Sequence, residues 1–225
     1  MRKITLRRFS GAGNIILAIV FLGMVLPSTT FAATENLDAK SESGTDKTPG
    51  MAVSPKPCNP SPITVPVKPE VIPGYTELDP ATGLHVTGTI PEINFESYRL
   101  EVSGKVSHPL SLSYDELRCM PRIEARPDLI CPGFFTDVAT WAGASLEHVL
   151  ELAGVQAGAK EIRLISAERY HSLMSLEQAR SGSNFLAYEL EGKPLPILHG
   201  FPVRAVFPEL EGNTWVKWLV KIEVN

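Results

Sequence analysis

Proline is distributed very unevenly along this chain, and its distribution decides which residues can build a folded core. Nine of the 19 prolines fall between Pro49 and Pro80, and in "SPKPCNPSPITVPVKPEVIPG" a proline recurs every two to four positions. Proline has no backbone N–H to donate to a sheet, so this stretch cannot form one. We therefore predict that residues 33–92, polar at first and then proline-rich, form an extended tether or an arm on the protein surface.

The first 32 residues have the layout of a secretory signal peptide. A segment with four Lys and Arg residues precedes a 12-residue apolar run from Ile15 to Leu26, and small residues follow at Thr30 and Ala32. This pattern predicts cleavage after Ala32 and a periplasmic or otherwise exported protein. An uncleaved anchor stays open as an alternative, although the run is shorter than the roughly 20 residues of a membrane span. Export by the Sec or the twin-arginine route is also open, since Arg7 and Arg8 are adjacent.

The charge of the remaining chain excludes one class of partner. The whole chain has 21 Lys and Arg against 25 Asp and Glu, and removing residues 1–32 leaves 17 against 25, a net charge of about −8. A protein this acidic does not bind nucleic acid or anionic lipid through a general basic field. Residues 93–225, on the C-terminal side of the predicted arm, number about 130 and suit one domain with its own core.

Within residues 93–225, strand patterns outnumber helix patterns. Capping residues indicate short helices after Ser113, after Ser145 and after Ser175. Alternating or apolar runs predict strands at 98–106, 126–131, 161–166, 170–175, 184–196, 201–208 and 215–224. Residues 108–113 form either a short strand or an extended link. Because helices and strands do not alternate regularly, a doubly wound parallel sheet is disfavoured. The fold class is predicted to be α+β, with mixed or antiparallel sheets and short helices.

The three cysteines leave at least one thiol unpaired within the chain. Cys58 lies in the proline-rich arm, Cys119 at the end of a predicted short helix, and Cys131 between an apolar strand and a Pro-Gly turn. Considered alone, Cys131 has three interpretations: a disulfide partner of Cys119, a buried free thiol, or a ligand. No CxxC or HExxH motif supports a zinc site.

Five segments, taken in order, resemble one known family. They are "YRLEVSGKVSHPLSLSYDELRCMP", "LICPGFFTDVATWAGASLEHVLELAGV", "SAERYHSLMSLEQA", "LAYELEGKPLPILHGFPVRAVFP" and "WVKWLVKIEV". Together they are similar to the molybdopterin-binding domain of the sulfite oxidase family, including small bacterial periplasmic members such as the methionine sulfoxide reductase catalytic subunit. The resemblance covers about residues 96–225. It implies the sulfite-oxidase-type fold and a molybdenum–molybdopterin cofactor.

The resemblance also implies roles for five residues. Cys131 matches the cysteine that ligates molybdenum, which makes it the metal-binding and catalytic residue; a soft thiolate suits that metal. His199 and Arg204, in "HGFPVR", match the residues that contact the pterin and its phosphate, and Lys217 in "WVKW" matches a further phosphate contact. Ser166 occupies about the place of a hydroxyl near the cofactor. Without the resemblance, each of the last four is an ordinary surface, turn or strand residue.

The implied activity is that of an exported molybdenum oxidoreductase that transfers an oxygen atom on a small sulfur- or nitrogen-oxide substrate. No CxxCH haem motif is present, so electrons are expected to pass to or from a separate partner, either a haem protein or a membrane subunit. The resemblance also implies that sulfite oxidation is disfavoured, because the active-site arginine that sulfite oxidases carry beside the metal cysteine has no clear counterpart in "CPGFFTDVATW". The altered turn "AERY" leaves a second hypothesis open: a cofactor-free exported binding module that retains the fold.

Overall fold

Residues 58–225 are the part of the chain that the computed structural model describes. The predicted signal peptide and the beginning of the predicted arm, up to residue 57, lie outside these residues. Among residues 58–225, no helix has the length and apolar character needed to cross a membrane.

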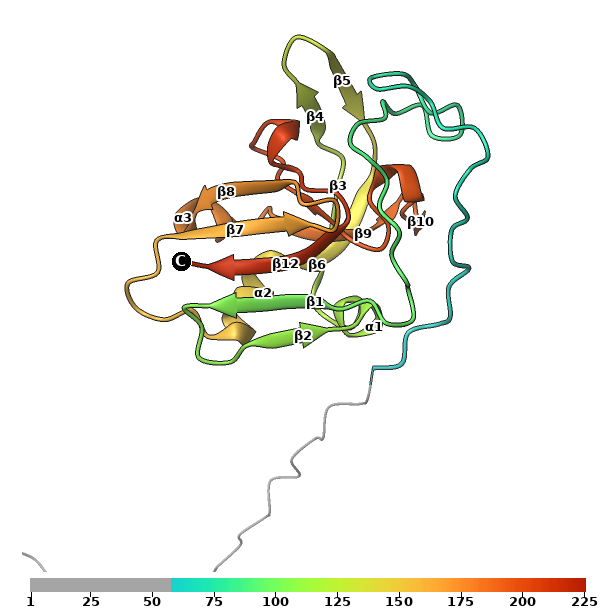
Figure 1. Cartoon of the computed structure of the whole chain (residues 1–225). Coiled ribbons are helices and arrows are strands. Elements are labelled where there is room, and N and C mark those ends of the chain that lie inside the picture. Colours follow the sequence, from blue (N-terminus) through green and yellow to red (C-terminus); the bar gives the residue numbers. More distant parts are fainter. Residues whose placement is uncertain (1–57) are drawn as a thin grey trace, which may run out of the picture. The chain divides into compact units, whose positions relative to one another are not determined.

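Two five-stranded sheets and a separate hairpin make up the fold (Figure 1). The first sheet runs in the order β2 (Leu110–Leu112), β1 (Leu100–Gly104), β12 (Leu219–Val224), β7 (Glu161–Ser166), β8 (His171–Ser175). The second runs β10 (Lys193–Pro194), β9 (Phe185–Leu190), β6 (Trp141–Ser145), β3 (Arg122–Ala125), and β11 (Arg204–Val206) also pairs with β9. The hairpin joins β4 (Asp128–Cys131) to β5 (Phe135–Val138). Among the strands of residues 58–225, only β1 and β12 pair in parallel, so the predicted α+β class with mixed sheets is confirmed.

The three predicted helices form where their capping residues stand. α1 (Tyr114–Arg118) and α3 (Leu176–Ala179) each begin with a reciprocal capping box, formed by Ser113 with Glu116 and by Ser175 with Gln178. α2 (Leu146–Ala153) begins at Ser145, whose side chain accepts a hydrogen bond from a first-turn N–H. It ends at Gly154 in the left-handed conformation.

Some strand predictions differ from the structure. Strands β3, β5 and β6 were not predicted. Trp141–Ser145 consists mostly of small residues and is buried on both faces, so its sequence shows no alternation. The predicted strand 201–208 is reduced to β11, because prolines stand at 202 and 208. Residues 215–218, predicted as strand, precede β12 and follow a short 3₁₀ turn, Gly212–Thr214.

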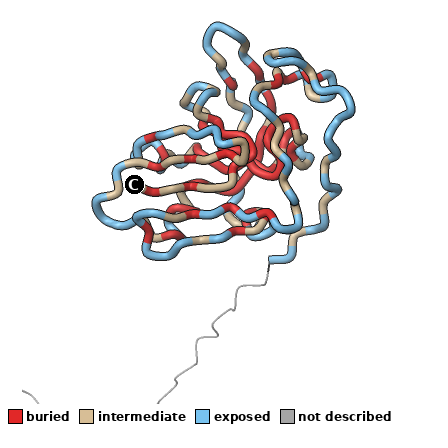
Figure 2. The backbone as a smooth tube through the Cα atoms, in the orientation of Figure 1, coloured by how far each residue is buried: buried red, intermediate tan, exposed pale blue. Residues whose placement is uncertain are grey.

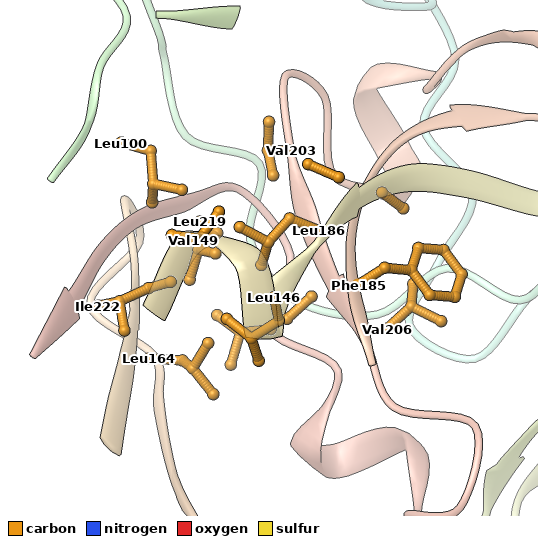
Figure 3. Packing of buried hydrophobic residues seen from close by; sticks show 14 of the residues in the cluster. Leu100, Leu146, Val149, Leu164, Phe185, Leu186, Val203, Val206, Leu219 and Ile222 are labelled. Atoms are coloured by element: carbon orange, nitrogen blue, oxygen red, sulfur yellow. The ribbon is translucent and has the colours of Figure 1, made fainter. Parts of the chain in front are cut away.

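The core gathers side chains from both sheets and from α2. Figure 3 shows Leu146 and Val149 of α2 beside Leu186 of β9 and Ile222 of β12, all of them fully buried. Figure 2 shows that the buried segments concentrate in the centre of the folded region, with exposed segments around them. The cluster joins both sheets into one core, from which the β4–β5 hairpin extends (Figure 1).

Residues 58–92 contain no helix or multi-residue strand, yet they pack against the domain. Leu84 and Val86 are buried, and Leu78 forms an isolated bridge with His85. A disulfide joins Cys58 to Cys119, 61 residues later, and so attaches the start of this segment to the end of α1. We call residues 58–92 the arm.

The disulfide corrects one interpretation of the cysteines. Cys131 is free, and Cys119 is bonded to Cys58, so the pairing of Cys119 with Cys131 is wrong. Figure 1 shows the reason: α1 and the β4–β5 hairpin lie at opposite ends of the folded region.

Candidate functional site

A cavity of about 270 Å³ lies where the arm meets the β4–β5 hairpin and the loops around β11 and β12. Its lining residues are Tyr75, Leu84, His85, Thr87 and Gly88 of the arm, Leu129, Cys131, Phe135 and Asp137 of the hairpin, and Trp141, Glu168, Tyr170, His199, Arg204, Gly212, Asn213, Trp215 and Lys217. The structure thus brings Cys131, His199, Arg204 and Lys217 together around one space. These residues are up to 86 positions apart in the sequence.

Cys131 is the last residue of β4 and stands where the hairpin turns. Its carbonyl accepts a hydrogen bond from the N–H of Phe134 at 3.0 Å, and Gly133 supplies the positive φ of the turn. Burial raises the pKa of the Cys131 thiol, and the carboxylates of Asp137 and Glu211 raise it further. A raised pKa does not suit a free nucleophile. A bound metal ion removes the thiol proton outright, so ligation remains well suited to this residue.

Arg204 is a buried cation without a carboxylate partner among the described residues. Its guanidinium lies over the rings of Trp141, at 4.6 Å, and Trp215, at 5.6 Å. One Nη donates to the carbonyl of His199 at 3.3 Å, whereas the buried Nε–H has no partner. Burial lowers the pKa of Arg204 to about 9, so the side chain remains charged at neutral pH.

Lys217 is a second buried cation on the same cavity. Its Nζ donates to the carbonyl oxygens of Leu198, at 3.0 Å, and Thr87, and it lies 4.6 Å from the centre of the Trp218 ring. Burial lowers the pKa of Lys217 to about 7, and the charge of Arg204 adds to that effect. Two cations that repel each other in a buried site favour an anion between them.

His199 connects this cavity to the arm. Its Nε2 lies 2.9 Å from Oδ2 of Asp79 and 2.8 Å from Oγ1 of Thr82. Burial lowers the pKa of His199 to about 4, and Arg204 and Lys217 lower it further despite the bond to Asp79. We therefore assign a neutral imidazole whose Nε2–H donates to Asp79.

Ser166 lies outside the set of residues that line the cavity. It is the buried last residue of β7, and its Oγ accepts a hydrogen bond from the N–H of Glu168 at 3.3 Å. The turn that it stabilises places Glu168 and Tyr170 on the cavity wall. The unusual "AERY" sequence adopts this turn with Arg169 at a φ of 73°, a conformation that glycine reaches more easily.

Several residues of the site were not predicted, and most belong to the arm. Asp79, Thr82 and Thr87 bond His199 or Lys217, and His85 bonds Asp137 of the hairpin. The local sequence "LDPATG" gives a weak signal, because an Asp before a Pro and a Gly is typical of a turn. Nothing in that pattern indicates contact with a histidine 120 residues later.

The residues around the cavity fit the cofactor that the resemblance implies. The unpartnered Arg204 Nε–H and the two buried cations provide donors and positive charge for a phosphate. A Cβ at Gly200 would lie 2.9 Å from the Cβ of Arg204, so glycine allows the close approach there. The soft thiol of Cys131 opens on the same cavity. Among residues 58–225, no group of three or more His, Cys, Asp or Glu side chains is arranged to hold a metal ion, so Cys131 would ligate alone.

Comparisons with known proteins agree with this assignment. The sequence profile of the oxidoreductase molybdopterin binding domain matches residues 87–225. The chain is 33% identical to the uncharacterized oxidoreductase YuiH of Bacillus subtilis, over 61% of this chain and 70% of that protein. It is 34% identical to human mitochondrial sulfite oxidase, over 60% of this chain but only 30% of that protein. It is also 27% identical to YedZ1 of Azospira oryzae, a putative protein-methionine-sulfoxide reductase subunit, over 60% of this chain and 52% of that protein.

A solved structure shows the same fold. The sulfane dehydrogenase SoxCD from Paracoccus pantotrophus superimposes with a TM-score of 0.58 at 22% identity, covering 78% of this chain and 55% of that chain. The resemblance to the sulfite oxidase family is therefore confirmed. From the match over residues 87–225 and the relatives it brings together, we conclude that this chain belongs to the oxidoreductase molybdopterin-binding domain family and is a molybdopterin-dependent oxidoreductase.

Proposed function

We propose that this protein is an exported reductase that removes the oxygen atom from a small, neutral sulfur or nitrogen oxide. The observation that carries the proposal is the sign of the charge beside Cys131. Asp137 lies on the same face of the β4–β5 hairpin as Cys131, and the carboxylates of Asp137 and Glu211 add to burial in raising the pKa of the Cys131 thiol, so the charges that act on this thiol are negative. An anion such as sulfite is repelled by such a site, whereas an uncharged sulfoxide or a zwitterionic N-oxide is not. The similarity to YedZ1, a putative protein-methionine-sulfoxide reductase subunit, supports the same substrate class.

In this proposal the buried cations bind the cofactor and leave the space beside Cys131 to the substrate. Arg204 and Lys217 hold the phosphate, His199 contacts the pterin as a neutral imidazole, and Cys131 is the one protein ligand of the metal. Trp141 and Trp215 keep the guanidinium of Arg204 in place by contact with both rings. When bound, the molybdenum cofactor supplies two-electron oxygen-atom transfer.

Export and a separate electron donor belong to the same proposal. The sequence of residues 1–32 supports export, and the attachment of the arm by a disulfide suits an oxidising compartment. YedZ1 is described as a subunit, which supports a partner that carries electrons. A haem protein or a membrane subunit would fill that role.

The cofactor-free binding module is the weaker hypothesis. It would leave Arg204 and Lys217 buried without an ion-pair partner among residues 58–225, because the carboxylates of Asp137 and Glu168 act on them only from beyond salt-bridge distance. Unpaired buried charges are strongly unfavourable.

The test begins with the full chain expressed in a host that makes the cofactor. We expect molybdenum and pterin near one equivalent each, and loss of molybdenum in Cys131→Ser but not in the double variant Cys58→Ser/Cys119→Ser. Loaded protein should oxidise reduced methyl viologen with dimethyl sulfoxide or trimethylamine N-oxide, and should not reduce ferricyanide with sulfite. Rapid sulfite oxidation without any oxide reduction would contradict the proposed substrate class.

A further inference from the structure

The cavity contains a histidine–aspartate pair that is separate from the proposed cofactor contacts. Nδ1 of His85 lies 2.6 Å from Oδ1 of Asp137, and the backbone N–H of His85 donates to Oδ2 at 2.7 Å. The side chain of Asp137 is 6% exposed and that of His85 is 25% exposed. A buried carboxylate needs such compensation. Both carboxylate oxygens of Asp137 are thus hydrogen-bonded to His85, the residue that Asp137 positions.

The geometry of the hairpin places this pair beside Cys131. Cys131 stands opposite Phe135, and Leu129 stands opposite Asp137, in the β4–β5 register. Opposite residues of an antiparallel pair share a face, with Cβ atoms about 5 Å apart. Residues two apart on one strand also share a face, so Cys131, Phe135 and Asp137 all point to the cavity that they line.

Phe135 completes the placement of the histidine. The ring of His85 stacks on the ring of Phe135, with centroids 4.3 Å apart and planes 9° from parallel. Stacking fixes the plane of the imidazole, and the bond to Asp137 fixes its rotation within that plane. His85 therefore lies over the end of the hairpin that carries Cys131.

One ring nitrogen of His85 remains available. With Nδ1 donating to Asp137, the remaining nitrogen is Nε2, and it has no hydrogen-bond partner among residues 58–225. A carboxylate on the far nitrogen orients an imidazole and compensates the charge that arises when Nε2 carries a proton. Nε2 of such a pair can donate or accept a proton, and the orientation of the ring fixes the direction in which it does so.

We propose that His85 is a catalytic residue, whose Nε2–H binds the oxygen of the substrate and delivers a proton to it, and that Asp137 is its positioning residue. This inference rests on the proposed function and deepens it. In the overall reaction, a sulfoxide or N-oxide takes up two electrons and two protons and yields the sulfide or amine and water. The sulfur–oxygen or nitrogen–oxygen bond breaks and two oxygen–hydrogen bonds form. The two electrons come from two equivalents of a reduced one-electron carrier; one proton comes from His85, which solvent then reprotonates, and the other comes from solvent.

His85 lies two residues before the start of the family match, at residue 87. The arm, rather than the matched domain, therefore contributes the substrate-side group. Asp137 and Cys131, by contrast, lie within the match, so the pair spans its boundary.

The first test compares His85→Gln and Asp137→Asn with His148→Gln, which changes a histidine of α2 outside the cavity. Each full chain is loaded with cofactor and assayed with reduced methyl viologen and trimethylamine N-oxide. Removal of a proton donor should lower the kcat of His85→Gln by about 100-fold or more. Loss of the positioning group should lower the kcat of Asp137→Asn by about 10-fold to 100-fold with little change in KM. Molybdenum content should stay at the wild-type level in all three, and His148→Gln should keep wild-type kinetics.

The second test does not depend on turnover. In protein labelled with ¹⁵N-histidine, the Nε2 resonance of His85 is assigned by its absence in His85→Gln. Trimethylamine N-oxide should shift this resonance in a saturable manner and leave that of His148 in place. Asp137→Asn should alter the His85 resonance before any ligand is added, because the tautomer is no longer fixed.

The outcomes separate this inference from the proposed function. If the wild type reduces no oxide but the His85 resonance shifts, the proposed function fails and oxide binding at His85 stands. If the wild type is active while His85→Gln keeps its kcat and KM, the role of His85 is refuted and the function stands. A proportional loss of molybdenum and activity in His85→Gln, without a resonance shift in the wild type, would show a structural role and refute the inference.

Discussion

Arg204 offers the sharpest test of what the buried charges do. We predict that Arg204→Met leaves the free energy of unfolding of the cofactor-free protein unchanged or raises it by up to about 1.5 kcal/mol, while abolishing retention of the cofactor. The pKa of Arg204 is lowered to about 9 from an ordinary 12.5, which at about 1.4 kcal/mol per pH unit corresponds to an electrostatic cost of about 5 kcal/mol. Methionine keeps much of the apolar volume and removes that cost.

Two favourable contacts are lost in the same substitution. The contact with the rings of Trp141 and Trp215 contributes about 2 kcal/mol in a desolvated site. The hydrogen bond to the carbonyl of His199 contributes about 1.5–3 kcal/mol. The stabilisation lost with these two contacts comes close to the electrostatic cost that the substitution removes. The cofactor-free variant should therefore be at least as stable as the wild type. An ordinary buried side chain behaves differently, because its truncation costs about 2–5 kcal/mol.

The assay is urea unfolding of both proteins, from a host without the cofactor and from a host that makes it. Arg122→Met is the control, because Arg122 pairs with Glu124 and Glu189 at the surface, where such pairs contribute about 0–1 kcal/mol. The cofactor should stabilise the wild type and not Arg204→Met. Destabilisation of cofactor-free Arg204→Met by more than about 2 kcal/mol would refute the reasoning, since Arg204 would then be a structural residue.

Three further predictions concern stability. The pKa of Lys217 is lowered to about 7 from 10.5, so between pH 7 and pH 10.5 the unfolded chain binds a proton that the native state has released. Over this range the free energy of unfolding of the cofactor-free wild type should rise by about 1 kcal/mol per pH unit relative to that of Lys217→Met. Parallel plots of urea-derived stability against pH for the two proteins would contradict this. Cys58→Ala/Cys119→Ala should lose about 2–4 kcal/mol because the bridge spans 61 residues, and a wild-type thermal midpoint insensitive to reductant would argue otherwise. Gly143→Ala would place a Cβ 2.0 Å from a carbonyl oxygen of β9 and should cost more than about 3 kcal/mol in urea unfolding, unlike Gly182→Ala, where the nearest atom is 3.9 Å away.

Features that depend on a few neighbouring residues could be predicted from the sequence. The capping boxes at Ser113 and Ser175 are complete within four residues, and both helices form as expected. The strand β6 was missed because its small residues are buried on both faces, and that burial depends on elements distant in the sequence or outside the strand, such as α1 and α2, that pack against it.

The residues of the site also divide into those that local sequence predicts and those that depend on distant parts of the chain. His199, Arg204 and Lys217 lie within 19 residues of one another, in segments with a family resemblance, and the structure places them around one cavity with Cys131. The bond between His85 and Asp137 joins residues 52 positions apart, and the disulfide joins residues 61 apart. No local pattern carries such pairings, because they depend on how the arm crosses the finished domain.

The disulfide also determines how mechanical force enters the molecule. Residues 58–119 form a covalently closed ring, since the chain and the Cys58–Cys119 bond join the same two points. Tension applied at the N-terminal side of Cys58 passes through the bond directly into Cys119 at the end of α1. The arm residues that bond His199, Lys217 and Asp137 lie inside the ring and bear none of that load. A pull on the leading segment of the chain would therefore reach the core without loading the part of the cavity wall that the arm contributes.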